Sequence, residues 1–182
     1  PPSTSHRQSS EAELLDAGGT GMSVMEWSHR SPEFVALKRE VERKLRAAAG
    51  VPDTHKVLFL QGGATLQFAM VPLNLMGGRS ADYAHTGHWG TKAIEEARRI
   101  GRVSLCTDSK ANKFTRIAPL SEWTLDSDAA YLHYTPNETI GGVEFPFVPE
   151  AEVPLVADMP STLLSRPSEV SRYGLLSAAP SV

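Results

Sequence analysis

The sequence predicts an α/β protein whose mostly parallel sheet is covered by helices on both faces. Short apolar runs of strand length alternate with segments of clear helical period, such as 32–49 and 89–100, and this alternation favours parallel βαβ units. Glycine pairs at 18–19, 62–63 and 77–78 separate the segments. The length of 182 residues, with 41% hydrophobic and 21% charged, is enough for one globular domain.

Composition limits which binding partners and which cellular compartment are expected. A formal net charge of −3 provides no broad basic surface, so nucleic acid is not an expected partner. No apolar run approaches the roughly 20 residues that span a bilayer, so no membrane partner is expected. The single cysteine, Cys106, rules out an intramolecular disulfide and favours the cytoplasm, with an organelle as the alternative if a targeting segment precedes residue 1. Residues 1–10 are polar and are expected to be disordered.

The N-terminal third is predicted to contain one short and one long helix. Residues 11–17 are expected to form the short helix, and 20–30 an ordered loop. The segment 32–49 carries apolar residues every three or four positions, which indicates an amphipathic helix. Ser31 suits its N-cap position, and Gly50 ends it.

The stretch 57–70 is predicted to be a buried strand at 57–60, a glycine turn at 62–63 and a helix over 64–75, shortened or kinked at Pro72. A turn of this kind leaves backbone N–H groups at the positive end of the helix dipole, which suits a phosphate. A tight connection without a ligand is the alternative. Neither nucleotide-binding fingerprint is present, so a phosphate carried by another kind of ligand is favoured.

The remaining chain is predicted to supply most of the sheet. One further helix is expected at 89–100, a short helix near 120–125 and a loop at 135–138. Expected strands lie at 81–84, 103–106, 129–134, 142–145 and 154–157. Because ligands collect at the carboxyl ends of parallel strands, the loops after residues 60, 86, 134 and 157 are expected to meet at one crevice.

Four side chains are candidates for binding a ligand. Trp89 opens a helix directly after a Gly-His loop, where its ring can stack on a planar ligand or, alternatively, pack partly buried. Asp158 ends an apolar strand, so its carboxylate needs a helix N-terminus, Arg166 or a cationic ligand nitrogen as its partner. His29 and Arg30 offer donors for a carboxylate or phosphate, with a surface salt bridge as the alternative.

Two other classes of site are not predicted. His85 and His88, with Asp82 nearby, are metal-ligating residue types, but they lack a helical spacing and a further ligand at a fitting distance. Ser161 and Ser165 have no histidine at a recognisable spacing, so a serine nucleophile is not expected.

Nine short blocks of sequence match, in order, those of a known enzyme family. The blocks are GTGMSVMEWSHRS from Gly19, LFLQGGAT from Leu58, VPLNLM from Val71, DYAHTGHW from Asp82, HYTPNETI from His133, GVEF from Gly142, and VADM, LSRP and VSRYG from Val156 onward. The chain therefore resembles the phosphoserine aminotransferases, class-V-type enzymes that depend on pyridoxal 5′-phosphate (PLP). The resemblance implies the large PLP-binding domain of the aspartate aminotransferase fold (fold type I).

The resemblance also implies how PLP is held. The backbone amides of Ala64 and Thr65 would bind the cofactor phosphate, and Trp89 would stack on the pyridine ring. Thr139 would form a hydrogen bond near the ring hydroxyl or the phosphate. Asp158 would pair with the pyridinium nitrogen and keep it protonated, so that the ring acts as an electron sink.

The implied reaction transfers an amino group from glutamate to 3-phosphohydroxypyruvate, yielding 2-oxoglutarate and O-phosphoserine in L-serine biosynthesis. Arg30, with His29, would bind the anionic group of the substrate across a dimer interface. The implied partners are these small molecules and a second copy of the full-length chain.

The resemblance to the family stops at Gly174. The family's Schiff-base lysine lies some two dozen residues after Asp158, whereas the last lysine here is Lys113. Pro160 stands where the family usually has serine, and 175–182 form an unmatched tail. Residues 11–174 are therefore expected to be a partial domain that lacks a strand beside Asp158, is poorly stable alone and is catalytically inactive. The alternative is a non-catalytic short isoform that dimerises with the full-length enzyme.

Overall fold

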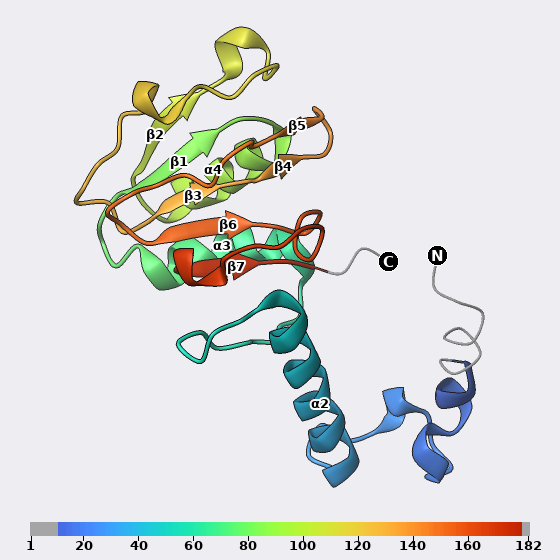
Figure 1. Cartoon of the computed structure of the whole chain (residues 1–182). Helices are drawn as coiled ribbons and strands as arrows, with labels where there is room; N and C mark the ends of the chain where they lie inside the picture. Colours follow the sequence, from blue (N-terminus) through green and yellow to red (C-terminus); the bar gives the residue numbers. More distant parts are fainter. Residues whose placement is uncertain (1–10, 180–182) are drawn as a thin grey trace. The chain divides into compact units, whose positions relative to one another are not determined.

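The computed structural model describes residues 11–179, which fall into two compact units (Figure 1). The first unit ends at Ala48 and the second begins at Ala49. The expectation of disorder over residues 1–10 lies outside the described residues. None of the helices in the described part is long and apolar enough to cross a membrane.

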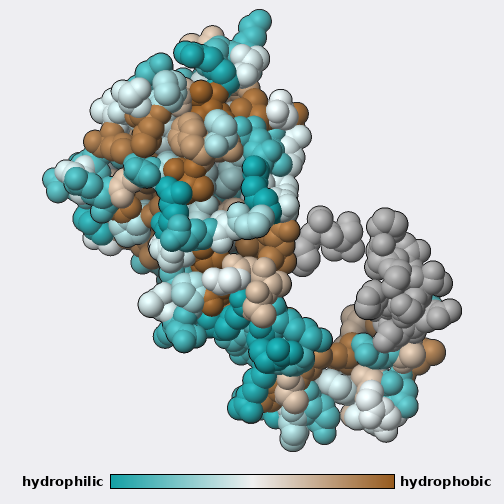
Figure 2. Space-filling model, viewed as in Figure 1, coloured by the Kyte–Doolittle hydropathy of each residue, from teal (hydrophilic) through white to brown (hydrophobic). Residues whose placement is uncertain are grey.

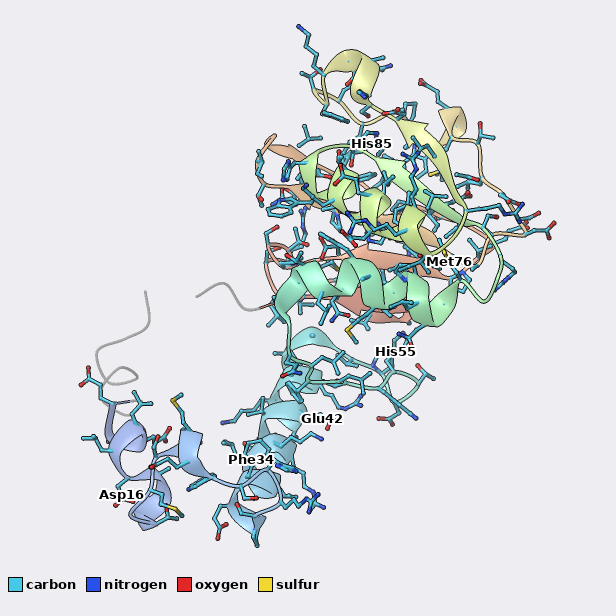
Figure 3. All side chains as sticks on the ribbon, turned by 180° about the vertical axis from the view of Figure 1, so that it is seen from behind. Asp16, Phe34, Glu42, His55, Met76 and His85 are labelled. Atoms are coloured by element: carbon cyan, nitrogen blue, oxygen red, sulfur yellow. The ribbon has the colours of Figure 1, made fainter. Side chains whose placement is uncertain are left out.

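The first unit is helical and contains the predicted long helix. Its elements are a short helix at 11–15, the 3₁₀ turns η1 (Ala17–Gly19) and η2 (Val24–Glu26), and helix α2 (Pro32–Ala49). The boundaries of α2 agree with the prediction because the predicted cap is made: the Phe34 backbone N–H donates to Ser31 Oγ at 3.2 Å. Phe34 is labelled on α2 in Figure 3. Gly50 follows the helix with a φ of 63°, a left-handed conformation that glycine adopts readily.

The second unit is built on a five-stranded, fully parallel sheet, which confirms the predicted α/β class with a mostly parallel sheet. Within the described residues the helices of this unit cover one face of the sheet, and not both as predicted. Its strands, in the spatial order β2-β1-β3-β6-β7, are β2 (Val103–Asp108), β1 (Ala81–His85), β3 (Leu132–Tyr134), β6 (Leu155–Asp158) and β7 (Leu175–Ser177). Two helices connect to them, α3 (Gly63–Leu75) and α4 (His88–Ile100). The predicted ranges for both helices are confirmed to within one residue.

The two faces of the sheet are covered differently. Helices α3 and α4 lie on the same face in both views (Figures 1 and 3), and we call this the helix face. Its core joins Tyr83, Tyr131 and Val156 of the sheet region to apolar residues of both helices. The opposite, loop face is covered by aromatic side chains from irregular segments, including Trp123 and Phe145. Alternate strand residues point to opposite faces, so both faces of the central strands are buried.

The predicted strand at 57–60 is wrong. Residues 57–60 form no regular structure, and Leu58, Phe59 and Leu60 are 71%, 49% and 55% exposed. A strand exists only where another strand pairs with its backbone, and within residues 11–179 no backbone hydrogen bond is made by this segment. Figure 2 shows in brown the hydrophobic residues that are exposed on the face of the molecule in view.

The structure also corrects the expected edge of the sheet beside Asp158. Strand β7, within the tail that the family blocks do not cover, pairs in parallel with β6, and Asp158 lies opposite Ser177. The Met159 backbone N–H donates to the Ser177 carbonyl at 2.7 Å. The segment before β7 is held by His55 (labelled in Figure 3), whose Nε2 lies 2.7 Å from the Tyr173 carbonyl oxygen.

Smaller differences concern short elements. Within the predicted loop at 135–138, β4 (Asn137–Glu138) pairs antiparallel with β5 (Val143–Glu144) in a separate two-stranded sheet. The predicted strand at 129–134 begins only at Leu132, and the short helix near 120–125 is the 3₁₀ turn η4 (Leu120–Glu122). The hairpin of β4 and β5 matters below because it carries two residues of the candidate site.

A buried pair of tyrosine hydroxyls supports the helix-face core and is testable. Tyr83 and Tyr131 are 1% and 0% exposed, and their hydroxyl oxygens lie 2.7 Å apart. Replacing either tyrosine by phenylalanine leaves the other hydroxyl buried without a partner, so each single change is expected to lower the free energy of unfolding by about 1–3 kcal/mol. In urea unfolding, the double variant is expected to lose clearly less free energy of unfolding than the sum of the two single losses. Additive losses would contradict this pairing.

Candidate functional site

Polar residues gather at the carboxyl ends of the neighbouring strands β1, β3 and β6. Thr86 follows β1, Thr135 follows β3, and Asp158 ends β6. All three are buried, and the hydroxyls of Thr86 and Thr135 have no hydrogen-bond partner among the described residues. Three of the four loops expected to converge therefore follow adjacent parallel strands, and this edge is the one where ligands bind in such sheets.

Asp158 is a buried carboxylate with no cationic partner among the described residues. It is 5% exposed and accepts one hydrogen bond, from Ser177 Oγ at 3.4 Å. Arg166, one of its predicted partners, forms an ion pair with Glu144 instead. Neither a cationic side chain nor a helix N–H contacts the Asp158 carboxylate within residues 11–179. Of the three partners considered from the sequence, a cationic ligand nitrogen is the one left.

The electrostatics of Asp158 follow from this environment. Burial raises the pKa of its carboxyl to about 6, the hydrogen bond from Ser177 opposes the rise, and the charge of Glu138 adds to it. Along β6, Val156 packs on the helix face and Ala157 on the loop face, so alternation places Asp158 on the helix face. A cationic group bound there would relieve the cost of the buried charge.

Trp89 lies in the first turn of α4 and is fixed at two atoms. Its backbone N–H donates to Glu138 Oε2 at 2.7 Å, and its indole Nε1–H donates to Thr139 Oγ1 at 2.9 Å. The side chain is half-buried and packs against the helix-face core, so the packing role considered from the sequence is present. The structure brings together Trp89 and Thr139, two of the residues named from the sequence.

Within the described chain the hydroxyl of Thr139 accepts a hydrogen bond and donates none. A threonine hydroxyl has one O–H donor and two acceptor lone pairs, and the indole of Trp89 uses one of the acceptors. Thr139 is exposed. It can therefore donate to a phosphate or phenolate oxygen while it holds the indole.

The N-terminus of α3 is open to an anion. Gly62 precedes the helix with a φ of 101°, and no side chain caps it. Within the described chain, the backbone N–H groups of Ala64 and Thr65 donate to no acceptor outside the helix. Thr65 is exposed and Ala64 half-buried, so both amides are available at the positive end of the helix dipole.

The N-terminus of α4, by contrast, already holds an anion that the sequence analysis missed. Glu138 is fully buried, and its two carboxylate oxygens accept from the N–H groups of Trp89 and Gly90 at 2.7 and 2.8 Å. Glu138 lies inside the matching block HYTPNETI, directly before Thr139. Its position next to Thr139 was the signal that could have identified Glu138. The sequence does not show its contact with Trp89, which lies 49 residues away.

The histidine considered as a metal ligand has other partners. His85 Nδ1 lies 2.8 Å from Asp108 Oδ1, and its Nε2 lies 2.8 Å from Thr91 Oγ1. The part of the chain that the structure describes contains no group of three or more residues placed to hold a metal ion. Two hollows of about 500 and 520 Å³ are lined by other segments, around Asp108 and around Glu150, and by none of the candidate residues.

His29 and Arg30 are exposed and belong to the first unit. Neither forms an ion pair with a described residue, so the surface salt bridge considered from the sequence is not made there. The Arg30 backbone N–H donates to Ser28 Oγ at 3.3 Å, which shapes the turn before α2. Their role in binding substrate stays a prediction.

The chain is similar to known aminotransferases. Residues 8–180 match the model of the family described as aminotransferase class-V. The phosphoserine aminotransferase of Ruthia magnifica subsp. Calyptogena magnifica is 56% identical over 168 residues, which cover 92% of this chain and 47% of that protein. The chain spans about half the length of the curated relatives it matches.

Two solved structures show the same likeness. Phosphoserine aminotransferase from Bacillus circulans subsp. alkalophilus has a TM-score of 0.92 at 42% identity, over 98% of this chain and 50% of that one. PLP-bound phosphoserine aminotransferase from Trichomonas vaginalis has a TM-score of 0.84 at 32% identity, over 98% of this chain and 51% of that one.

The raised pKa of Asp158 predicts how stability changes with pH. Below about pH 4 the carboxyl is protonated in the folded and unfolded chain alike, whereas above about pH 6 the fold bears a buried charge. Asp158→Asn is therefore expected to raise the free energy of unfolding by about 2–3 kcal/mol at pH 8 and by little at pH 4. Urea unfolding at both pH values measures this, with the exposed Asp53→Asn as control. An equal effect at the two pH values would contradict it.

Proposed function

The chain belongs to the class-V aminotransferase family, and we propose that its second unit is the PLP-binding domain of a phosphoserine aminotransferase. The reaction proposed for the whole protein is amino-group transfer from glutamate to 3-phosphohydroxypyruvate, which yields 2-oxoglutarate and O-phosphoserine for L-serine biosynthesis. The names of its relatives support this substrate class.

The observation that carries the proposal is the Asp158 carboxylate, which is buried at the carboxyl end of β6 without a cationic partner in the described residues. A protonated pyridine nitrogen is a cation with one N–H donor, and it matches this carboxylate in charge and in hydrogen bonding. When bound, PLP supplies an aldehyde and an electron-accepting ring for amino-group transfer. The residues present fit that group.

Each candidate residue is assigned one contact with the cofactor. The amides of Ala64 and Thr65 bind the phosphate at the open N-terminus of α3. The indole of Trp89 stacks on one side of the ring and excludes water from it. The Thr139 hydroxyl donates its proton to the ring hydroxyl or the phosphate. Asp158 holds the proton on the ring nitrogen.

His29 and Arg30 are proposed to bind the anionic groups of the substrates. Both substrates carry carboxylates, and 3-phosphohydroxypyruvate also carries a phosphate, so paired N–H donors suit them. The proposal includes a homodimer of the full-length protein and a cytoplasmic location. The printed sequence has no lysine after Lys113, so cofactor binding, and not the Schiff-base step, is assigned to these residues. The alternative of a non-catalytic dimerisation partner has no observation of its own in its favour.

Comparing PLP with pyridoxal, which lacks the phosphate, tests each contact separately. The 182-residue chain is expected to bind PLP more tightly than pyridoxal at pH 7.5. Ala64→Pro removes one amide donor in the first turn of α3, where proline is tolerated, and is expected to weaken PLP binding about tenfold without changing pyridoxal binding. Asp158→Asn is expected to weaken both. Titration calorimetry gives the affinities.

The exposed Asp53→Asn serves as the control and is expected to bind both compounds as the unaltered chain does. Equal affinity of the unaltered chain for PLP and pyridoxal would remove the phosphate site from the proposal. Unchanged binding in Asp158→Asn would remove the pyridinium contact.

A further inference from the structure

Glu138 is a buried carboxylate for which no role follows from the sequence. It is 0% exposed, and no lysine or arginine within residues 11–179 pairs with it. Burial raises the pKa of its carboxyl, while the hydrogen bonds from the Gly90 and Trp89 amides oppose the rise. A buried carboxylate with no cation is costly, so the first turn of α4 is what compensates its charge.

The chain around Glu138 is shaped to admit its side chain. A Cβ atom added at Gly87 would lie 2.5 Å from the Glu138 Cδ atom and 2.7 Å from Oε2. A Cβ atom at Gly90 would lie 3.0 Å from Oε1. Gly87 has a φ of 173°, an extended backbone that any residue adopts. The glycine at this position is therefore explained by contact with Glu138, and not by backbone strain.

The short strand that carries Glu138 is anchored on both sides. The backbone carbonyl of Glu138 accepts a hydrogen bond from the Gly142 N–H at 2.8 Å, and β4 pairs with β5. Asn137, the preceding residue, donates from its side-chain amide to Ser161 Oγ at 3.1 Å, in the loop that follows Asp158. Thr139, the next residue, accepts from the Trp89 indole.

We propose that Glu138 is the positioning residue for Trp89: its carboxylate fixes the first turn of α4 and, together with Thr139, sets the orientation of the indole that faces the cofactor. Trp89 is thereby held at its backbone by Glu138, the last residue of β4, and at its ring by Thr139, the first residue of the turn that follows. The carboxylate also occupies the anion site of α4, which leaves the N-terminus of α3 for a phosphate. The ligand in this inference rests on the proposed function, whereas the control of the indole by Glu138 does not.

Exchange of the Trp89 indole proton tests the geometry without any cofactor. In NMR spectra of chain labelled at the indole nitrogen, Trp89→Phe identifies the signal, and Trp27 and Trp123 are internal references. Glu138→Gln has the same shape but places an NH₂ group against an N–H donor, so the Trp89 indole proton is expected to exchange at least about tenfold faster. The two reference signals are expected to stay unchanged. Unchanged Trp89 exchange would overturn the inference.

A double-mutant cycle at Gly87 and Glu138 tests the contact between these two residues. Gly87→Ala is expected to displace the carboxylate and to speed Trp89 indole exchange as Glu138→Gln does. In a Glu138→Ala background, the added Cβ has room, so Gly87→Ala is expected to change the exchange rate by less than about twofold further. Gly141→Ala is the control, because its Cβ atom would come no closer than 4.0 Å to its nearest neighbour. Equal effects of Gly87→Ala in both backgrounds would overturn the contact.

Cofactor titrations then connect the geometry to the site. Glu138→Gln is expected to weaken PLP and pyridoxal by the same factor, about fivefold or more, because stacking involves the ring and not the phosphate. The exposed Glu152→Gln is the control and is expected to bind as the unaltered chain does. If the unaltered chain binds neither compound, the proposed function fails and the exchange measurement still decides the role of Glu138. If it binds both and Glu138→Gln binds them equally well, the positioning role fails.

Discussion

The structure of the site depends on how two buried carboxylates are compensated. Glu138 receives two backbone N–H groups from the first turn of α4, which satisfies its charge within the protein. Asp158 receives one long hydrogen bond from Ser177 and has no cation in the described chain. The first carboxylate therefore holds protein elements together, and the second remains available to a ligand. A difference in hydrogen-bond donors, and not in residue type, separates the two roles.

The parallel sheet makes this arrangement possible. Its central strands are buried on both faces and end at the same edge, so the residues that follow them lie next to one another without any contact in sequence. The helices that begin at that edge direct their N–H groups toward it. Helix α4 meets a carboxylate of the protein, and α3 meets none within residues 11–179. The fold thus provides two equivalent helix ends and leaves one of them open.

The sequence predicted what depends on local chemistry. The helix at 32–49 was predictable because its cap, its apolar period and its terminal glycine are all local. The strand at 57–60 was not, because apolarity does not report whether a pairing strand is present. Asp158 was identified from its position at the end of an apolar run. Glu138 was missed because its partners lie 48 and 49 residues away, and strand β7 because its sequence lies outside the matching blocks.

The unpaired charge of Asp158 links the lifetime of the protein to the supply of its ligand. A group that binds the folded chain alone stabilises it in proportion to the logarithm of its concentration. Because the chain bears a buried charge until a cation binds, its unfolded fraction is largest when the ligand is scarce. Cellular proteases act on that fraction. A chain that binds PLP as proposed would therefore be turned over more slowly when PLP is plentiful, without any change in gene expression.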